Sequence, residues 1–387
     1  MKILFLDQFA QIGGAQQCLL DLLPAFQNQK HELRFAVVDG GPFPDKLRQS
    51  GVRVDVLPGC SLSNLHKPVT DSLRYLRWYP KAARFVKKLG TDFRPDLLYV
   101  NGPRLLPPVA LFAAQSRIPL LFHAHNRILQ ASALSCLGMH LRFAPARVIA
   151  CCRYVADSLR SYVPPIRIET VYNGVPDMAR RSRSSRPNDD LRIGVIGRIE
   201  PEKGQLEFVQ AARLVNRELP ACRFLIIGAP LLDKSEGYFH RVQAECRDLP
   251  VTMMGWQTDI PSVLQQLDLL VVPSMPHDAT PRVIMEAFSA GTPVLAFRSG
   301  GIPEIIDDNR TGFLVNTRSP QDLAARLLQL LGTDRNAMAC AAANARRKWE
   351  AEFQLETYRA RICGIISAIR PEGGMIPPDR SFAIYRE

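Results

Sequence analysis

The first half of the chain alternates short apolar runs with amphipathic stretches. The apolar runs are KILFLD (2–7), LRFAVV (33–38), VRVDVL (52–57), DLLYVN (96–101), PLLFHAH (119–125) and RVIACC (147–152). A helical spacing of apolar residues follows the first run, in AQQCLLDLLPAF (15–26). Short β-rich runs alternating with helical stretches are typical of βαβ units, in which helices cover both faces of a parallel sheet. This half is therefore predicted to be an α/β domain with a parallel sheet.

A polar segment, DMARRSRSSRPNDD (177–190), breaks this pattern, and its composition suits a solvated linker. The alternation then resumes with LRIGVIG (191–197), CRFLIIG (222–228), VTMMG (251–255), LDLLVVPS (267–274), TPVLAF (292–297) and TGFLV (311–315). We predict two Rossmann-like α/β domains, 1–176 and 191–350, joined by the linker 177–190. We expect one long last helix over about 334–369. Residues 351–387 would comprise the end of that helix, which can cross back to the first domain, and a loose tail.

The composition is that of a globular protein, with 47% hydrophobic and 22% charged residues, enough for two cores. No apolar run approaches the roughly 20 residues that span a bilayer. The N-terminal run leads into a Gly-Gly turn rather than a cleavage site, which favours a buried strand over a signal peptide. The nine cysteines include no CxxC pair, which favours free thiols in a reducing cytoplasm. We therefore expect a cytoplasmic protein.

A formal net charge of +12 can reflect nucleic acid, an anionic membrane surface or phosphorylated small molecules as a partner, or a basic surface with no partner at all. No zinc finger, RNA-recognition signature or long basic tail is present, so we expect no nucleic-acid partner. Residues 73–90, LRYLRWYPKAARFVKKLG, place basic side chains beside aromatic ones. This segment is either an ordinary helix that packs Ala83, Val86 and Leu89 on the core, or a surface that rests on anionic lipid. In either case Pro80 interrupts the segment or begins its longer helix.

Two acidic residues bracket a predicted helix start in PSMPHDATPRVIMEAFSAG, which begins at residue 273. Thr280 is expected to cap a helix whose first residue is Pro281, and Gly291 to end it. Asp278 precedes this helix and Glu286 lies two turns into it. Such a pair can bind two hydroxyl-rich parts of one ligand; alternatively Asp278 supports the helix dipole and Glu286 is a surface residue.

Arg198 and Lys203 follow the strand LRIGVIG, in GRIEPEKG (197–204). A diphosphate leaving group needs positive charge from a metal ion or from Arg and Lys. The sequence contains no Asp-x-Asp pair to hold a divalent ion. We therefore expect no metal cofactor, and we assign the diphosphate to these two side chains.

These motifs resemble those of the family 4 retaining glycosyltransferases. The resemblance rests on GRIEPEKG, LIIGAP, the segment 251–274, DATPRVIMEAFSAGTPVLAF and GGIPEII in the second half, and on LDQFAQIGGAQ, FHAHN and VYNGV in the first. It implies the GT-B fold, in which two Rossmann-like domains face each other across a cleft, the first receiving the acceptor and the second the nucleotide sugar.

The resemblance also assigns roles within the second half. Arg198 and Lys203 match the residues that hold the donor diphosphate. Glu286 matches the acid that binds the ribose, and Asp278 the acid that contacts the transferred sugar. Trp256 falls where the base lies against the chain, although a buried core tryptophan is an equal alternative.

In the first half, Gly13 and Gly14 match the loop on the phosphate or acceptor side of the cleft, although a Gly-Gly turn is also a common strand-to-helix connection. His125 matches the histidine that faces the sugar at the reaction centre. His123 points to the same side of the strand and takes this role if the register differs.

The chain departs from the family at two places. Asp278 stands where a glutamate is usual, and Thr280-Pro281 where Phe-Gly is usual. Pro281 has no N–H to donate to a sugar hydroxyl. Thr280 is assigned to donor binding, but the identity of the donor sugar stays open.

The resemblance implies metal-independent transfer of a hexosyl unit, with retention, from a UDP- or GDP-sugar to a glycan or lipid-linked acceptor. Cell-surface polysaccharide or glycolipid synthesis is the expected setting, with peripheral contact to an anionic membrane. One alternative is a non-catalytic sugar-nucleotide or glycan-binding protein on the same scaffold, which would not hydrolyse the donor. Another is a GT-B nucleotide-sugar epimerase, which would isomerise the donor without an acceptor.

Overall fold

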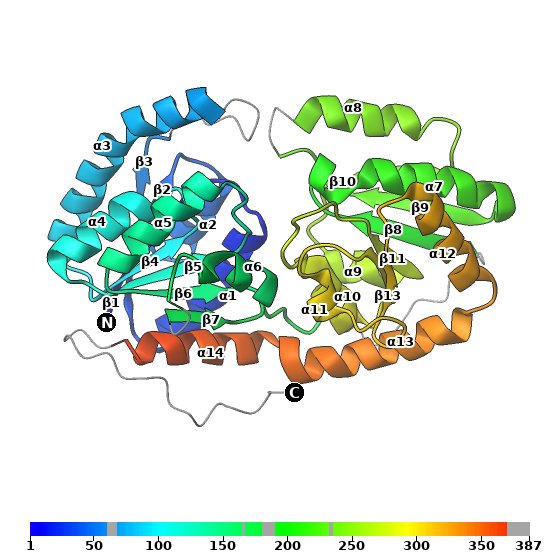
Figure 1. Ribbon diagram of the computed structural model, residues 1–387. Helices are drawn as coiled ribbons and strands as arrows, with labels where there is room; N and C mark the ends of the chain where they lie inside the picture. The colour runs from blue at the N-terminus through cyan, green and yellow to red at the C-terminus, as the bar shows by residue number, and fades with distance from the viewer. Residues whose placement is uncertain (60–67, 165–166, 180–189, 232–234, 370–387) are drawn as a thin grey trace. The chain divides into compact units, whose positions relative to one another are not determined.

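The computed structural model describes residues 1–59, 68–164, 167–179, 190–231 and 235–369 (Figure 1). Two compact units divide the chain. Unit 1 comprises residues 1–150, 156–171 and the chain from 359 onward, and unit 2 comprises residues 151–155 and 172–358. Most of the predicted linker, residues 180–189, and the predicted loose tail from residue 370 lie outside the described residues.

Unit 1 contains a seven-stranded parallel sheet of order β3-β2-β1-β4-β5-β6-β7. Its strands are β1 (Lys2–Asp7), β2 (Glu32–Val38), β3 (Arg53–Leu57), β4 (Leu97–Asn101), β5 (Leu120–Ala124), β6 (Ala146–Ala150) and β7 (Ile168–Thr170). The intervening helices are α1 (Gly14–Asn28), α2 (Pro42–Gln49), α3 (Pro68–Phe93), α4 (Leu106–Ser116), α5 (Ala131–Phe143) and α6 (Arg153–Arg160). All six apolar runs predicted here are strands, and β7 is an additional one.

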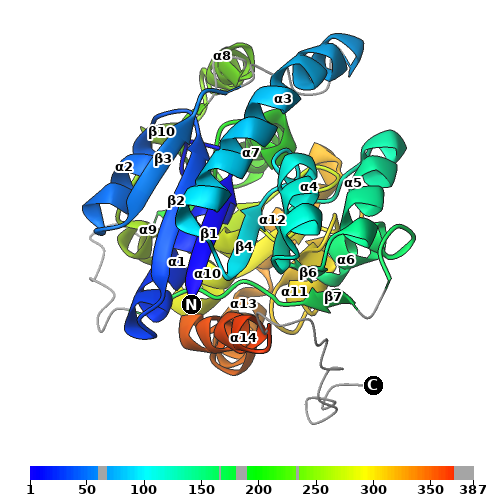
Figure 2. The same cartoon turned by 90° about the vertical axis from the view of Figure 1, so that its left-hand side faces the viewer.

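Helices cover both faces of this sheet, as the apolar strands predict. Helices α3, α4 and α5 lie side by side on one face, and α2 lies on the other (Figure 2). In α3, Val86 and Leu89 are buried as predicted, but Ala82 takes the core position that was predicted for Ala83. Pro80 lies inside α3 and neither interrupts nor begins it.

Unit 2 contains a six-stranded parallel sheet of order β10-β9-β8-β11-β12-β13. Its strands are β8 (Leu191–Ile196), β9 (Cys222–Ile227), β10 (Val251–Gly255), β11 (Leu269–Val272), β12 (Val294–Phe297) and β13 (Phe313–Val315). Its helices are α7 (Gln205–Glu218), α8 (Glu236–Glu245), α9 (Ile260–Gln266), α10 (Arg282–Ala290), α11 (Ile302–Ile305), α12 (Pro320–Gly332) and α13 (Arg335–Lys348). Each strand lies in one of the six predicted runs.

Alternate residues of β11 enter two separate cores, one on each face of the sheet. Leu269 and Val271 pack with Phe208 of α7, whereas Leu270 and Val272 pack with Phe288 of α10. Successive side chains of a strand point to opposite faces, so a strand buried on both sides must be continuously apolar. This explains why LDLLVV shows no polar alternation.

The single long helix expected over about 334–369 is wrong. Helix α13 ends at Lys348, a π-helical turn follows (Trp349–Phe353), and α14 (Leu355–Ser367) begins after the extended residue Gln354. The wider turn buries both Trp349 and Phe353. Gln354 forms a β-bridge with Val175, so the break provides a docking point for another segment of unit 2.

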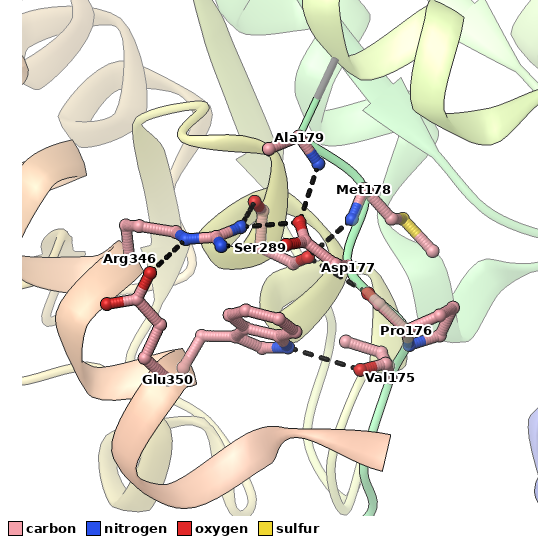
Figure 3. A network of polar contacts seen from close by, with 9 residues as sticks. Val175, Pro176, Asp177, Met178, Ala179, Ser289, Arg346 and Glu350 are labelled. Carbon is pink, nitrogen blue, oxygen red and sulfur yellow. Dashed lines mark hydrogen bonds and ion pairs between the residues drawn. The ribbon is translucent and has the colours of Figure 1, made fainter. Parts of the chain in front are cut away.

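Arg346 joins that other segment to α13 (Figure 3). Its guanidinium donates to both carboxylate oxygens of Asp177, at 2.6 and 2.8 Å, and to the Ser289 carbonyl at 2.6 Å. It also pairs with Glu350 and lies 4.3 Å from the Trp349 ring centroid. Hydrogen bonding to Arg346 lowers the pKa of Asp177, so the pair stays charged at neutral pH. Residues 175–179 are thereby fastened to α13.

Replacing Arg346 with Met should lower the unfolding free energy of unit 2 by about 1–3 kcal/mol, because a partly buried bidentate pair and a cation–π contact are lost together. Arg347→Met is the matched control: Arg347 is exposed and hydrogen-bonds Asn344, and we expect a change within about 0.5 kcal/mol. Urea unfolding of both variants and the parent measures the difference. Equal losses in the two variants would contradict this role of Arg346.

Candidate functional site

In unit 2, the two predicted groups of site residues follow two adjacent strands. Arg198 and Lys203 follow β8, and Asp278 and Glu286 follow β11. In the strand order, β8 and β11 are neighbours. The chain continues from β8 to β9 towards one edge of the sheet, and from β11 to β12 towards the other edge. Open α/β sheets bind ligands beyond the carboxyl ends of the strands at such a switch point. The topology therefore brings Arg198, Lys203 and Asp278 to the edge where sheets of this kind bind ligands, and Glu286 lies on the helix that begins there.

Lys203 and Asp278 form an ion pair at this edge. The Lys203 Nζ donates to Asp278 Oδ2 at 2.6 Å, and the Ser274 hydroxyl donates to the same oxygen at 2.8 Å. The two side chains are 22% and 14% exposed, so the pair is largely shielded but still reaches solvent. Asp278 thus contacts the cation rather than merely supporting the helix dipole.

Close backbone packing holds this pair in place. Gly204 has φ +68°, and a Cβ there would lie 2.0 Å from the Pro273 carbonyl oxygen. Gly300, at φ +54°, would likewise place a Cβ 1.8 Å from the carbonyl oxygen of Asp278. The glycines of GRIEPEKG and GGIPEII therefore allow loops from three strands to approach one another closely.

The other two predicted residues also have charged partners. Arg198 donates to Glu200 at 3.2 Å, and Glu200 is buried. Glu286 lies 3.5 Å from Arg282 on the same helix, and both side chains are shielded, at 15% and 10% exposure. Glu286 is therefore not the surface residue of the alternative interpretation.

Thr280 does not cap α10, which corrects that expectation. The helix begins at Arg282, Pro281 occupies the N-cap position, and no side-chain cap bond forms there. The Thr280 hydroxyl instead lies 3.4 Å from the Asn173 amide nitrogen. With ψ at 111°, Pro281 is still in an extended conformation, so the helical turn starts one residue later than predicted. Gly291 ends the helix as predicted, at φ +72°.

Trp256 lies at the end of the edge strand β10 and is 51% exposed. The alternative of a buried core tryptophan is therefore wrong. Gly255, in the left-handed region at φ +68°, turns the chain just before it. An exposed indole at a strand end can stack on a planar ring.

In unit 1, Gly13 and Gly14 begin α1 after the loop that follows β1. Gly13 is the N-cap residue, and its N–H donates to Gln16 Oε1 at 3.2 Å. Both glycines stand at a strand-to-helix connection on the carboxyl side of β1, next to the β1–β4 switch point. This position is compatible with both interpretations of the Gly-Gly turn, as a loop on the phosphate or acceptor side of a site and as an ordinary strand-to-helix connection.

The two histidines occupy different environments. His123 is fully buried, and its Nδ1 lies 2.6 Å from the Tyr99 hydroxyl. Burial lowers the pKa of His123 well below its ordinary value, with a smaller electrostatic contribution from His125, so this ring is neutral. His125 follows the strand, is only partly buried and lines a small pocket with Gln16 and Asn101. Because His125 lines a pocket and His123 is fully buried, His125 is the better candidate of the two for contact with a ligand.

A buried polar cluster lies behind this pocket. Asp7 accepts hydrogen bonds from the Phe9 N–H at 2.8 Å, from Gln16 Nε2 at 3.0 Å and from Asn101 Nδ2 at 2.5 Å. Asn101 Oδ1 lies 2.7 Å from His125 Nε2. Our sequence analysis missed Asp7 and Asn101; the available signal was a polar residue at the last position of each of two adjacent strands, KILFLD and LLYVN.

Comparison with known proteins agrees with this geometry. Residues 12–177 match the family described as Glycosyltransferase Family 4, and residues 190–333 match the family described as Glycosyl transferases group 1. The chain belongs to the group 1, family 4 glycosyltransferases. It is therefore a glycosyltransferase that uses a nucleotide sugar.

Individual relatives of this glycosyltransferase span most of its length. It is 21% identical, over 90% of this chain and 92% of the relative, to the UDP-Gal:alpha-D-GlcNAc-diphosphoundecaprenol alpha-1,3-galactosyltransferase of Escherichia coli. It is 24% identical to spore coat protein SA of Bacillus subtilis, over 83% and 86% of the two chains. The solved structure of Anabaena Alr3699/HepE in complex with UDP and glucose aligns with a TM-score of 0.79 at 23% identity, covering 95% of this chain and all of that one. This last likeness confirms the GT-B fold.

The carboxyl group of Asp7 gives the glycosyltransferase a characteristic pH dependence. Burial raises the pKa of Asp7 to about 6, against the lowering effect of its hydrogen-bond donors. The folded protein therefore binds a proton here that the unfolded chain has lost, so rising pH costs stability between about 4 and 6, by up to about 3 kcal/mol. His123 acts in the opposite sense, because its lowered pKa makes stability rise as pH increases through its unfolded value.

Comparing Asp7→Asn with the parent isolates the first effect, because His123 is present in both proteins. We expect the unfolding free energy of the parent to fall relative to that of Asp7→Asn as the pH rises from 4 to 6, measured by urea unfolding. Asp45→Asn is the matched control, since Asp45 is exposed and pairs with Arg48 on α2. Parallel curves for Asp7→Asn and the parent would contradict a carboxyl group that titrates in this range.

Proposed function

We propose that this glycosyltransferase moves a hexosyl unit, with retention, from a UDP- or GDP-sugar to a glycan or lipid-linked acceptor. The observation that carries the proposal is the Lys203–Asp278 pair at the switch point of unit 2, where Arg198 follows the same strand as Lys203. This pair supports the proposal because a cation that can bind a diphosphate lies within one hydrogen bond of an acid that can accept from sugar hydroxyls. The setting would be cell-surface polysaccharide or glycolipid synthesis, as the name of the Escherichia coli relative suggests.

In this proposal, Arg198 and Lys203 neutralise the charge that develops on the leaving diphosphate. A lysine ammonium has three donors, so Lys203 can keep Asp278 and still donate to a phosphate oxygen. Asp278 would accept from hydroxyls of the sugar, and Thr280 would contribute to the donor site beside it.

The nucleoside has its own proposed partners in unit 2. Glu286 is shielded and paired with Arg282, and its carboxylate can accept from the ribose hydroxyls. Trp256 offers an exposed ring for the base. In unit 1, His125 would face the sugar, and the Gly13–Gly14 turn would lie on its phosphate or acceptor side.

No carboxylate among the assigned residues is an evident nucleophile, in contrast to the two acids of retaining glycosidases. We therefore propose a front-face reaction with an oxocarbenium-like transition state. The bond from the anomeric carbon to the diphosphate oxygen breaks, and the acceptor hydroxyl forms its bond on the same face of the sugar. The departing phosphate takes the acceptor proton, so the charges balance without a protein base.

Transfer assays test the proposal on the parent, Lys203→Ala and Glu286→Ala. The donors are UDP- and GDP-sugars, the acceptors are lipid-linked, and each assay is run with and without EDTA. Parent activity should be nearly unchanged by EDTA, because Arg and Lys take the role of a metal. Both variants should lose about 100-fold or more of kcat/KM, as expected when a charged transition-state or nucleotide contact is removed. Their unfolding midpoints should stay near that of the parent.

Lys348→Ala is the matched control, because Lys348 is also an ion-paired lysine of unit 2, bonded to Asp307 at 3.0 Å, but has no assigned role. Activity within about threefold of the parent in Lys203→Ala or Glu286→Ala would contradict the site. A requirement for Mg²⁺ or Mn²⁺ would contradict the metal-independent mechanism. Isomerisation of the donor without an acceptor would favour the epimerase instead.

A peripheral membrane contact is the second part of the proposal. No helix among the described residues is long and apolar enough to span a bilayer. On α3, Leu73 and Leu76 are 62% and 65% exposed, and the exposed Arg74 and Arg77 lie next to them. Phe143, at the end of α5, is 78% exposed. Apolar side chains among cations favour an anionic lipid interface.

Two aromatic residues of α3, Tyr75 and Trp78, bond to other parts of unit 1 and do not belong to this surface. Trp78 is buried and donates from Nε1 to the Pro58 carbonyl, and the Tyr75 hydroxyl donates to the Arg104 carbonyl. The ordinary interpretation of α3 thus holds for its core-facing residues. The lipid interpretation depends on the exposed Leu73 and Leu76 and on the neighbouring Arg74 and Arg77.

Co-sedimentation with vesicles of rising phosphatidylglycerol content should recover the parent at low salt and release it at high salt. The double variant Arg74→Glu/Arg77→Glu should lose most of this binding, since each basic residue near the surface contributes about 1 kcal/mol. Arg217→Glu/Arg247→Glu, an equal charge change at exposed positions of unit 2, serves as the control. Binding that is absent in the parent, or equally reduced in both variants, would rule out this surface of α3.

A further inference from the structure

We propose that Asp7 and Asn101 are positioning residues, which fix the tautomer of His125 through a hydrogen-bond relay from carboxylate to amide to imidazole. The inference deepens the proposed function, because it concerns the histidine assigned to the sugar. It adds two residues to the machinery of unit 1 that the motifs do not indicate.

The relay begins with the direction of the bonds at Asp7. Its oxygens are surrounded by donors: the Phe9 backbone N–H, the Gln16 amide and the Asn101 amide. A pKa of about 6 leaves this carboxyl group ionised at neutral pH, when it can only accept hydrogen bonds. The NH₂ group of Asn101 must therefore face Asp7.

This constraint passes to His125 through the amide. With its nitrogen directed at Asp7, Asn101 can present only its carbonyl oxygen to His125 Nε2, at 2.7 Å. A carbonyl oxygen cannot donate, so Nε2 must carry the proton. The reversed amide would set its oxygen against the carboxylate, and its NH₂ group would face Nε2, which suits only the opposite tautomer. Ionised Asp7 thus selects one orientation of Asn101 and, through it, one tautomer of His125.

The relay is built on rigid elements. Asp7 and Asn101 are the last residues of β1 and β4 and face each other in the register of the sheet. They are 0% and 2% exposed, and Gln16 is 4% exposed, so water does not compete for these bonds. The neutral ring of His123 lies behind, with its centroid 3.9 Å from that of His125. Buried networks of this kind hold a side chain in one geometry when every member is satisfied.

The selected tautomer has a chemical consequence. Neutral imidazole with its proton on Nε2 carries its lone pair on Nδ1, which then accepts from a hydroxyl group. The opposite tautomer or the imidazolium ion would donate from Nδ1 instead. The relay therefore makes the neutral His125 ring a hydrogen-bond acceptor towards the proposed sugar, as a carboxylate orients the histidine of a catalytic triad.

The test is nitrogen NMR of protein labelled with ¹⁵N-histidine, at pH 7.5 and without substrate, with His125→Gln used to assign the signal. In the parent, His125 should be predominantly the Nε2–H tautomer. In Asp7→Asn and in Asn101→Ala, both tautomers should be populated, because the amide is no longer oriented or no longer present. Asp45→Asn should match the parent. Asp7→Asn preserves side-chain size and so provides the test even where Asn101→Ala does not fold.

Transfer kinetics give the second measurement. Each relay variant should lose about 10- to 100-fold in kcat, the range for losing one hydrogen bond to a charged group, with KM for the nucleotide sugar changed less than about threefold. A predominant Nε2–H tautomer that persists in Asp7→Asn overturns the relay, whatever the activity. A changed tautomer with an unchanged kcat overturns its role in transfer. If the parent transfers no sugar, the proposed function fails, but the NMR result still decides the relay.

Discussion

The ion pair between Lys203 and Asp278 connects the fold to the chemistry in unit 2. These residues are 75 positions apart in the sequence, yet their charged groups lie 2.6 Å apart. They meet because parallel strands end at one edge of the sheet, and β8 and β11 are neighbours at the switch point. The rest of the site depends on this contact: Ser274 bonds the same carboxylate oxygen, and Gly204 and Gly300 let the surrounding loops approach.

Unit 1 applies the same constraint to different residues. Asp7 and Asn101 end β1 and β4, which are the strands on either side of its switch point, and His125 follows β5 next to them. Unit 2 keeps a partly solvated ion pair at this place, which suits a charged diphosphate. Unit 1 keeps a buried, hydrogen-bonded carboxylate below a histidine, which suits the orientation of a neutral group. The same topology thus brings together two different kinds of polar cluster in the two units.

The sequence was sufficient to predict every strand of unit 2 and six strands of unit 1, because strands buried on both faces leave continuous apolar runs. Strand β7 was missed: it has only three residues, all half-buried, and IET carries no such run. The break at Trp349–Gln354 was also missed, because helical periodicity continues through it. What ends the helix is the docking of Val175, a tertiary contact. The start of α10 was displaced by one residue because proline fixes φ but leaves ψ free.

Candidate site residues could be selected from the sequence where their residue types are chemically distinctive. Arg198, Lys203, Asp278 and Glu286 stand out as charges at predicted strand and helix ends. Asp7 and Asn101 do not, because each reads as an ordinary polar residue that ends a strand. Their importance lies in a hydrogen bond across 94 residues, and a single sequence without an alignment carries no trace of such a partner.

The central claim is that Arg198 and Lys203 hold the donor through its diphosphate. Calorimetric titration in EDTA tests it most directly, by comparing UDP with UMP and GDP with GMP. Two cations on the terminal phosphate should make at least one diphosphate bind about tenfold or more tightly than its monophosphate, with the difference shrinking as salt is added. Equal affinities within both pairs, or a difference that appears only with a divalent metal ion, would contradict the claim.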